Sequence, residues 1–235
     1  MYQFAFAKAK FKIKPMNVNR SFKIGILLGQ LLILGSCGNA PKEEEKLNQT
    51  KEINAVDILG NPDYQAISYG GYRGISREEQ PTIAQLKEDM KIMAAMGIKV
   101  LRTYNVQPNL PHASNILAAI KELKNEDADF EMYVMLGAWI DCKNAWTGLE
   151  PDHNIESEAN AGEIARAVAL ANKYPDIVKV IAVGNEAMVK WAASYYVQPA
   201  VILKWVNHLQ GLKKKGKLSK DLWITSSDNF ASWGG

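Results

Sequence analysis

An asparagine–glutamate pair ends the most apolar segment of the sequence. The segment VIAVGNEAMV places Asn185 and Glu186 directly after a predicted buried strand, Val178–Gly184. A carboxyl that emerges from an apolar strand is partly desolvated, which favours its protonated form. Such a carboxyl can donate a proton to a leaving-group oxygen, and the neighbouring amide can hydrogen-bond a substrate hydroxyl. The pair alone is also compatible with a simple cap, or with an ion pair between Glu186 and Lys190.

Polar and aromatic residues also lie at the carboxyl ends of the other predicted strands. They are Tyr69 and Tyr72; Arg102, Tyr104 and Asn105; Trp139 and Asp141; Asp228 and Asn229. Because the carboxyl ends of barrel strands meet at one face, we expect Tyr69, Tyr104, Trp139, Asn185, Glu186 and Asp228 to converge there. Trp139 lies within an apolar run and is equally explained as a core residue. Arg102 is either a substrate contact or a buried partner of acids such as Glu186.

Other catalytic chemistries find little support in the sequence. His112, His153 and His208 are scattered without HExxH or another metal-ligand spacing, so no metal site is predicted. Neither GxGxxG nor GxxxxGK[ST] follows a strand, so no nucleotide cofactor is expected. Cys142 has no histidine near it in the sequence that would activate it, and an ordinary thiol is expected.

Strand and helix patterns alternate from residue 65 onward and would position these side chains. The predicted strands are Gln65–Tyr69, Ile98–Tyr104, Phe130–Ile140, Val178–Gly184 and Leu222–Ser226. Helical patterns cover 82–97, Ser114–Lys124, Ala159–Tyr174 and Pro199–Lys215. Thr82 and Gln85 form a capping box, and Gly97 ends the first of these helices. The nearly continuous apolar character of the third and fourth strands is typical of a parallel sheet covered on both faces.

The order βαβαβαβαβ fits either a doubly wound open sheet or a (β/α)₈ barrel. Polar and aromatic residues after every strand, without phosphate-binding glycine motifs, favour the barrel. The predicted fold class is therefore α/β, an incomplete (β/α)₈ TIM barrel with about five β/α units. Eight units at a spacing of roughly 39 residues would need about 310 residues, more than follow position 65. We therefore expect the chain to be the N-terminal part of a longer protein.

The first forty residues have the pattern of a bacterial lipoprotein signal. The apolar run IGILLGQLLIL follows Arg20 and Lys23 and is too short to span a bilayer. It ends in Leu-Gly-Ser before Cys37, which resembles a lipobox, the motif whose cysteine becomes the lipidated N-terminus. The start of the signal is either Met1 or Met16, since counting from Met16 gives a signal of ordinary length.

This pattern predicts three segments with different environments. Residues 1–36 are a signal peptide, residues 37–60 a polar tether, and residues 61–235 the N-terminal part of the barrel. Lipidation of Cys37 predicts anchoring in the bacterial cell envelope, at the outer membrane, either periplasmic or surface-exposed. The net charge is +3, but six basic residues and no acidic one lie in residues 1–36. The remainder is mildly acidic, so no nucleic acid partner is expected.

Five segments of the chain resemble glycoside hydrolase family 17, the β-1,3-glucanase-like (β/α)₈ glycosidases. The segments are ISYGGYRG, KVLRTYN, VMLGAWID, VIAVGNEA and ITSSDNFASW, one for each predicted strand and in the family's order. The resemblance implies retaining hydrolysis of β-glucan, most directly β-1,3-glucan, without a cofactor. It assigns the acid/base role to Glu186, with Asn185 beside it. Tyr69 corresponds to the family's strand-one tyrosine, and Ser68 stands where the family has asparagine.

The resemblance places the family's nucleophile on a seventh strand, which this chain lacks. Retaining hydrolysis needs two carboxyls about 5–5.5 Å apart, so we expect the 235-residue chain alone to be inactive. The candidate substrate-binding residues are Tyr69, Tyr104, Trp139, Asp141, Asn185 and Asp228, because aromatic rings stack on sugar faces and polar groups bond hydroxyls. Two alternatives remain open: a β-glucan transglycosylase, and a non-catalytic glucan-binding surface lipoprotein.

Overall fold

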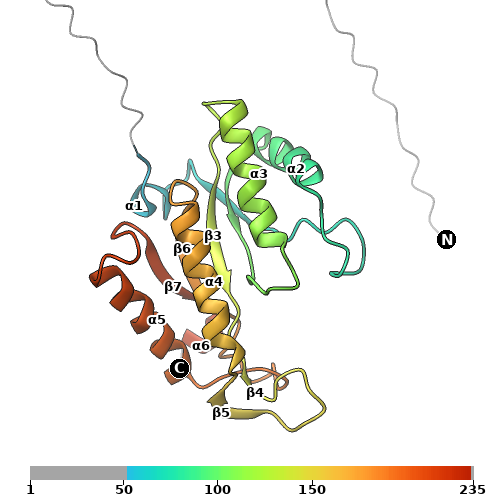
Figure 1. Cartoon of the computed structure of the whole chain (residues 1–235), viewed down its shortest axis with the longest axis vertical. Helices are drawn as coiled ribbons and strands as arrows, with labels where there is room; N and C mark the ends of the chain where they lie inside the picture. Colours follow the sequence, from blue (N-terminus) through green and yellow to red (C-terminus); the bar gives the residue numbers. More distant parts are fainter. Residues whose placement is uncertain (1–51, 234–235) are drawn as a thin grey trace, which may run out of the picture. The chain divides into compact units, whose positions relative to one another are not determined.

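Five parallel strands form the central sheet in a computed structural model, which describes residues 52–233 (Figure 1). The predicted signal peptide, Cys37 and most of the predicted tether lie outside the described residues. Among the residues described, no helix combines the length and apolar character needed to cross a membrane.

The strands of the sheet are β1 (Gln65–Ser68), β2 (Ile98–Arg102), β3 (Tyr133–Ala138), β6 (Val178–Asn185) and β7 (Trp223–Ser227). Each strand pairs in parallel with the next, in the order β1-β2-β3-β6-β7. The spatial order therefore follows the chain, as in a (β/α)₈ barrel, whereas a doubly wound sheet reverses its order. The predicted strands are confirmed, and the fold is that of an incomplete α/β barrel.

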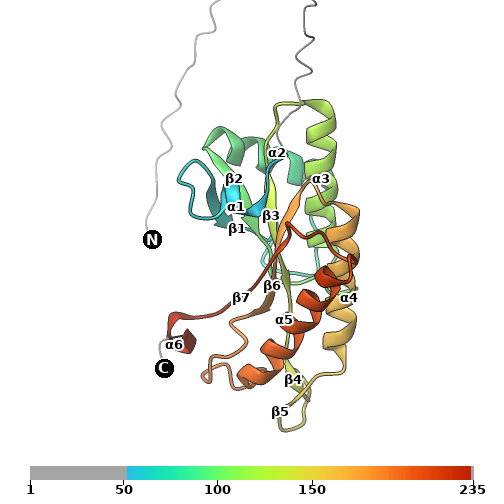
Figure 2. The same cartoon turned by 90° about the vertical axis from the view of Figure 1, so that its left-hand side faces the viewer.

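Four long helices pack on one face of the sheet. They are α2 (Ile83–Ala95), α3 (His112–Glu126), α4 (Ala159–Lys173) and α5 (Pro199–Lys214). All four contribute buried apolar side chains to a single core with the strands, and Figure 2 shows α3, α4 and α5 along one side of the sheet. The capping box of Thr82 and Gln85 is present, and Gly97 has a φ of +85°. Because a left-handed φ suits glycine, Gly97 ends α2 as predicted.

The opposite, inner face of the sheet is covered at its amino end by the short helix α1 (Ala55–Ile58). Ile58 is buried against Val100 of β2 and Tyr133 of β3. The predicted boundary between tether and barrel at residue 60 is therefore too late. A helix of four residues is too short to show a helical period in the sequence. The polar segment before it therefore gave no sign that the fold begins at α1.

An antiparallel hairpin leaves the carboxyl end of β3 and was not predicted. Its strands are β4 (Cys142–Lys143) and β5 (Asp152–Glu156). In Figure 1 the hairpin lies beyond the end of the main sheet, below α4. A short helix, α6 (Phe230–Trp233), follows β7. The hairpin therefore extends the face at which the polar strand-end residues were expected to meet.

Candidate active site

Arg102 connects four strands across the inner face of the sheet. Its guanidinium donates to Ser68 Oγ of β1 at 3.3 Å, to Asn185 Oδ1 of β6 at 2.5 Å and to Ser227 Oγ of β7 at 2.6 Å. Within residues 52–233 Arg102 forms no salt bridge. It is therefore a structural partner of Asn185 and fixes the amide next to Glu186, rather than a partner of Glu186 itself.

Tyr104 lies beside this arginine because a glycine on β3 leaves room for its backbone. The Arg102 guanidinium carbon is 5.4 Å from the centre of the Tyr104 ring. A Cβ at Gly137 would come within 2.4 Å of the Thr103 carbonyl oxygen and 2.8 Å of the Tyr104 Cα. The backbone of Thr103 and Tyr104 can therefore approach β3 this closely only when residue 137 is glycine.

Glu186 occupies a strained turn at the end of β6. Its φ is +49° and its N–H donates to the Ser227 carbonyl at 2.8 Å. Gly184, two residues earlier, has a φ of +79°, and a Cβ there would approach the side chains of Ala187 and Ile202 to 3.0 Å. A non-glycine residue in the left-handed region costs free energy and is maintained only where its surroundings fix it. Such strain is concentrated at functional sites.

Asp228 holds the turn that carries Glu186. Its Oδ2 accepts from the Met188 N–H at 2.8 Å, and its Oδ1 accepts from the Asn229 N–H at 2.9 Å. Both oxygens therefore bond to backbone, and one of these bonds reaches the loop that follows Glu186. Asp228, predicted as a substrate-binding residue, thus orients its neighbours in this structure.

Three aromatic rings from three segments pack together at the carboxyl end of the sheet. Trp139 follows β3, Trp146 lies in the β4–β5 hairpin, and Tyr195 lies in the loop between β6 and α5. The Tyr195 ring centre is 5.1 Å from each of the two indoles, and the two indoles are 6.2 Å apart. Burial, together with the charges of Glu186 and Asp228, raises the pKa of Tyr195.

Asp141 is buried behind this aromatic group. The Trp139 Nε1–H donates to Asp141 Oδ2 at 3.3 Å, so the carboxylate fixes the indole. Burial raises the pKa of Asp141, and the nearby Ser157, Trp139 and Trp146 partly offset that effect. Its other oxygen, Oδ1, makes no hydrogen bond of normal geometry within the part of the chain that the structure describes.

A buried glutamate on α4 joins the loops that follow β2 and β3. Glu163 Oε1 accepts from the Val106 N–H at 2.6 Å and from the Trp139 N–H at 3.0 Å. Its Oε2 accepts from Arg166 at 2.9 Å, and Arg166 Nε donates to the Val106 carbonyl at 2.7 Å. One turn earlier, the Asn160 side chain bonds both the N–H and the carbonyl of Asp141. These contacts position Trp139 and Asp141.

Neither Asn160 nor Glu163 was predicted as a site residue, although the helical pattern of α4 contained a signal. The buried positions of α4 are Asn160, Glu163, Ile164, Ala167 and Ala171, which follow the helical period. Two polar residues thus occupy positions where the period requires core residues. Buried polar groups must be hydrogen-bonded, so their presence there indicates a specific partner.

Tyr69 is at the expected end of the sheet, but its side chain lies on the other face. Its hydroxyl donates to Asp89 Oδ2 of α2 at 2.6 Å, and burial and this bond raise its pKa. Strand residues alternate between faces, so Ser68, and not Tyr69, points toward Arg102. The structure therefore brings Tyr104, Asn185, Glu186, Trp139 and Asp228 to one end of the sheet, while Tyr69 supports α2.

The three histidines make packing contacts rather than a common site. His112 Nδ1 lies 3.0 Å from the Tyr72 hydroxyl, and burial lowers the pKa of His112. His153 stacks on Tyr196 with ring centres 3.6 Å apart, and His208 contacts the edge of Trp205. Across residues 52–233, no group of three or more His, Cys, Asp or Glu side chains is arranged to hold a metal ion. Cys142 is a buried free thiol, and burial raises its pKa.

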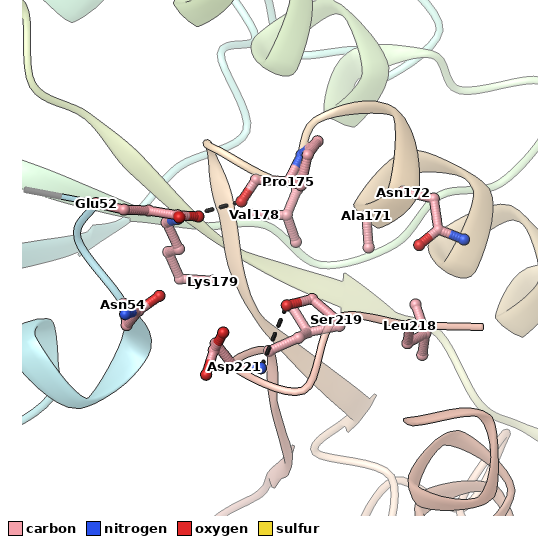
Figure 3. Close-up of a pocket in the computed structure, with 11 residues that line it drawn as sticks. Glu52, Asn54, Ala171, Asn172, Pro175, Val178, Lys179, Leu218, Ser219 and Asp221 are labelled. Atoms are coloured by element: carbon pink, nitrogen blue, oxygen red, sulfur yellow. Dashed lines mark hydrogen bonds between the residues drawn. The ribbon is translucent and has the colours of Figure 1, made fainter. Parts of the chain in front are cut away.

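A separate pocket lies at the amino end of the sheet (Figure 3). Lys179 of β6 is 6% exposed there, and its Nζ donates to the Pro175 carbonyl at 3.1 Å. Burial lowers the pKa of Lys179, while Glu52, Asp176 and Asp221 oppose that change. Catalytic groups of α/β barrels lie at the opposite, carboxyl end of the strands, so this pocket is a structural feature.

A solved structure closely resembles this chain. The crystal structure of an endo-laminarinase from Formosa Hel1_33_131 shares 76% sequence identity with it, with a TM-score of 0.76. The match covers 77% of this chain and 46% of that enzyme, so the chain spans less than half of the enzyme's length. No protein-family model matches the chain, and no curated protein sequence matches it.

Proposed function

We propose that this chain carries the acid/base half of a retaining β-1,3-glucan hydrolase of glycoside hydrolase family 17. The support is the 76% identity to an endo-laminarinase, together with the five strand segments that resemble the family. The observation that carries the proposal is the placement of Glu186. It stands at the carboxyl end of a barrel strand, in a strained turn that Ser227 and Asp228 hold from the neighbouring segment.

In this proposal Glu186 protonates the glycosidic oxygen and then deprotonates the attacking water. Both steps require a carboxyl held rigidly beside the scissile bond. The Glu186 N–H donates to the Ser227 carbonyl, which fixes the backbone of Glu186. The Met188 N–H donates to Asp228 Oδ2, which fixes the turn that follows Glu186. Arg102 orients Asn185 so that its amide N–H groups are available to a sugar hydroxyl next to the acid.

Retention also requires a nucleophilic carboxylate about 5–5.5 Å from the acid. Asp228 accepts two backbone N–H bonds, and Asp141 is buried behind Trp139. Neither is free to attack an anomeric carbon. We assign the nucleophile to a residue outside the described range, on the seventh strand that the resemblance implies.

Substitution of Glu186 tests the proposal. In the protein that carries both carboxylates, Glu186→Gln should slow hydrolysis of β-1,3-glucan by roughly 10²–10⁴-fold while glucan binding is retained, because only proton transfer is lost. The matched control is Glu158→Gln, an exposed glutamate directly before α4, which should leave turnover unchanged. Full activity of Glu186→Gln on natural glucan would show that another group is the acid.

We also propose that the mature protein is lipid-anchored in the bacterial cell envelope through Cys37. The apolar run of residues 24–34 and the Leu-Gly-Ser-Cys sequence support this proposal. Mass spectrometry of the mature N-terminus should identify an acylated Cys37 and no residue before it. A protein isolated from cells with its N-terminus at Met1 or Met16 would contradict the anchor.

A further inference from the structure

The ring of Trp146 is held in an exposed position by a strained but well-bonded loop. Trp146 is 62% exposed and has a φ of +63°, and Asn144 before it has a φ of +65°. The loop is bonded internally: the Thr147 N–H and hydroxyl both donate to the Asn144 carbonyl, and the Asn144 side chain donates to the Glu150 carbonyl. A bulky residue in the left-handed region is a genuine outlier, and strain of this kind marks functional positions.

The hairpin that carries Trp146 is fastened to the loop that carries Tyr195. The Cys142 N–H donates to the Tyr195 carbonyl at 3.2 Å, and His153 Nδ1 donates to the Tyr196 carbonyl at 2.9 Å. The Trp205 indole N–H donates to Glu156 Oε2 at 2.6 Å and attaches β5 to α5. These bonds hold the Trp146 and Tyr195 rings together in a stack with an interplanar angle of 21°.

The three rings form one aromatic cluster, and the loop that carries Tyr195 is bonded to the residue after Glu186, because the Val197 N–H donates to the Ala187 carbonyl at 2.7 Å. Trp146, which is stacked on Tyr195, is the exposed outer member of this cluster. Aromatic faces with carboxylates at their edge suit a pyranose ring, whose C–H face is apolar and whose hydroxyls are donors. Rigid rings add affinity because little conformational freedom is lost on binding.

We propose that Trp146, Tyr195 and Trp139 form an aromatic ledge that binds glucose units of the substrate remote from the scissile bond. This inference rests on the proposed function, because it takes a β-1,3-linked glucan as the ligand. The ledge makes affinity depend on chain length: an oligomer long enough to extend from Glu186 to Trp146 gains a stacking contact that a shorter one lacks.

Binding of two oligomers to the protein that carries both carboxylates, in its Glu186→Gln form so that neither oligomer is cleaved, tests the ledge. The dissociation constants of a β-1,3-linked trisaccharide and hexasaccharide are measured for the parent and for Trp146→Gly, which removes the ring and suits the left-handed backbone. The variant should weaken hexasaccharide binding by about tenfold and leave the trisaccharide within about twofold. Trp146→Phe should restore most of the loss. Trp223→Ala, an exposed tryptophan at the amino end of β7, is the matched control and should have no effect.

The other outcomes contradict the aromatic ledge, or both the ledge and the proposed function. Unchanged hexasaccharide affinity in Trp146→Gly would overturn the ledge while leaving the proposed function intact. Equal weakening of both oligomers with a lowered melting temperature would show that Trp146 is a structural residue, and would also overturn the ledge. If the parent binds neither oligomer, the proposed function fails and the ledge fails with it.

Discussion

At the carboxyl end of the sheet, buried acidic side chains bond to the backbone of loops, whereas at the amino end charged side chains mainly contact other side chains. Glu163 binds the N–H groups of Val106 and Trp139. At the other end, Glu131 accepts from the hydroxyls of Tyr64 and Tyr133 and forms a salt bridge with Lys99 at 2.6 Å. The contacts of Glu163 fix the backbone conformation of two loops. The contacts of Glu131 pack side chains together at the amino end of the sheet.

The distribution of strain and exposure follows the same division. The non-glycine residues with positive φ among residues 52–233 are Asn144, Trp146 and Glu186, all at the carboxyl end. At the amino end the tyrosines are partly desolvated, and burial and Glu131 raise the pKa of Tyr64 to about 12. Strain therefore accumulates at the end of the sheet that carries the proposed site, and no non-glycine residue with positive φ lies at the amino end within residues 52–233.

Removal of the Glu163 carboxylate should have the largest effect on stability. Glu163→Ala leaves two loop N–H groups without their acceptor and Arg166 without its ion pair. The free energy of unfolding should fall by about 3 kcal/mol, as expected when one partner of a buried charged network is lost. Denaturant unfolding measures the change.

The control for this experiment is on the same helix. Glu158 is exposed and its side chain makes no capping hydrogen bond, so Glu158→Ala should change stability by less than about 0.5 kcal/mol. Glu163→Gln keeps an acceptor for both N–H groups and should lie between parent and Glu163→Ala. If Glu163→Ala is as stable as the parent, the backbone bonds at the carboxyl end do not hold the loops.

Removal of the buried charge at the amino end should have a much smaller effect. Lys179→Met keeps the aliphatic stem and discards an ammonium whose pKa is lowered by burial. Replacement of a buried charge by an apolar group of similar shape is often neutral or stabilising, so a change within about 1 kcal/mol is expected. If Lys179→Met lowers the free energy of unfolding as much as Glu163→Ala does, the two ends of the sheet do not differ in how their buried charges contribute to stability.

The pH dependence of this comparison has a definite sign. Because the pKa of Lys179 is lower in the folded protein than in the unfolded chain, the unfolded chain binds more protons between the two values. The parent should therefore gain stability relative to Lys179→Met as the pH rises through that window, up to the ordinary lysine value of about 10.4. Unfolding free energies of both proteins between pH 7 and about 10.5 measure the difference.

The sequence predicted that the candidate site residues lie at the carboxyl end of the sheet, but not on which face of the sheet each side chain lies. Asn185 and Glu186 follow an unmistakable buried strand, and the structure places them as expected. Tyr69 follows a short strand whose residues are all exposed, so no burial pattern distinguished its two faces. A shift of one residue in a strand reverses its faces, and here Ser68 is the inward residue.

The hairpin and the α4 contacts show what a linear pattern cannot reveal. Residues 144–151 contain glycine, proline and polar residues without alternation, so β4 and β5 read as loop. The stacking of Trp146 on Tyr195 joins positions far apart in the sequence, and only the fold brings them together. Glu163 was visible as a polar residue in a core position of α4, but its partners in two loops were not.

The central claim, that Glu186 is the acid/base and not the nucleophile, is tested most directly by chemical rescue. Glu186→Gln, in the protein that carries both carboxylates, is given a β-glucan substrate whose leaving group needs no protonation, and azide is added. Glycosylation should then proceed, and azide should resolve the glycosyl-enzyme to give the β-glycosyl azide, because the nucleophile is intact. An α-glycosyl azide would mean that Glu186 itself is the nucleophile and would contradict the account.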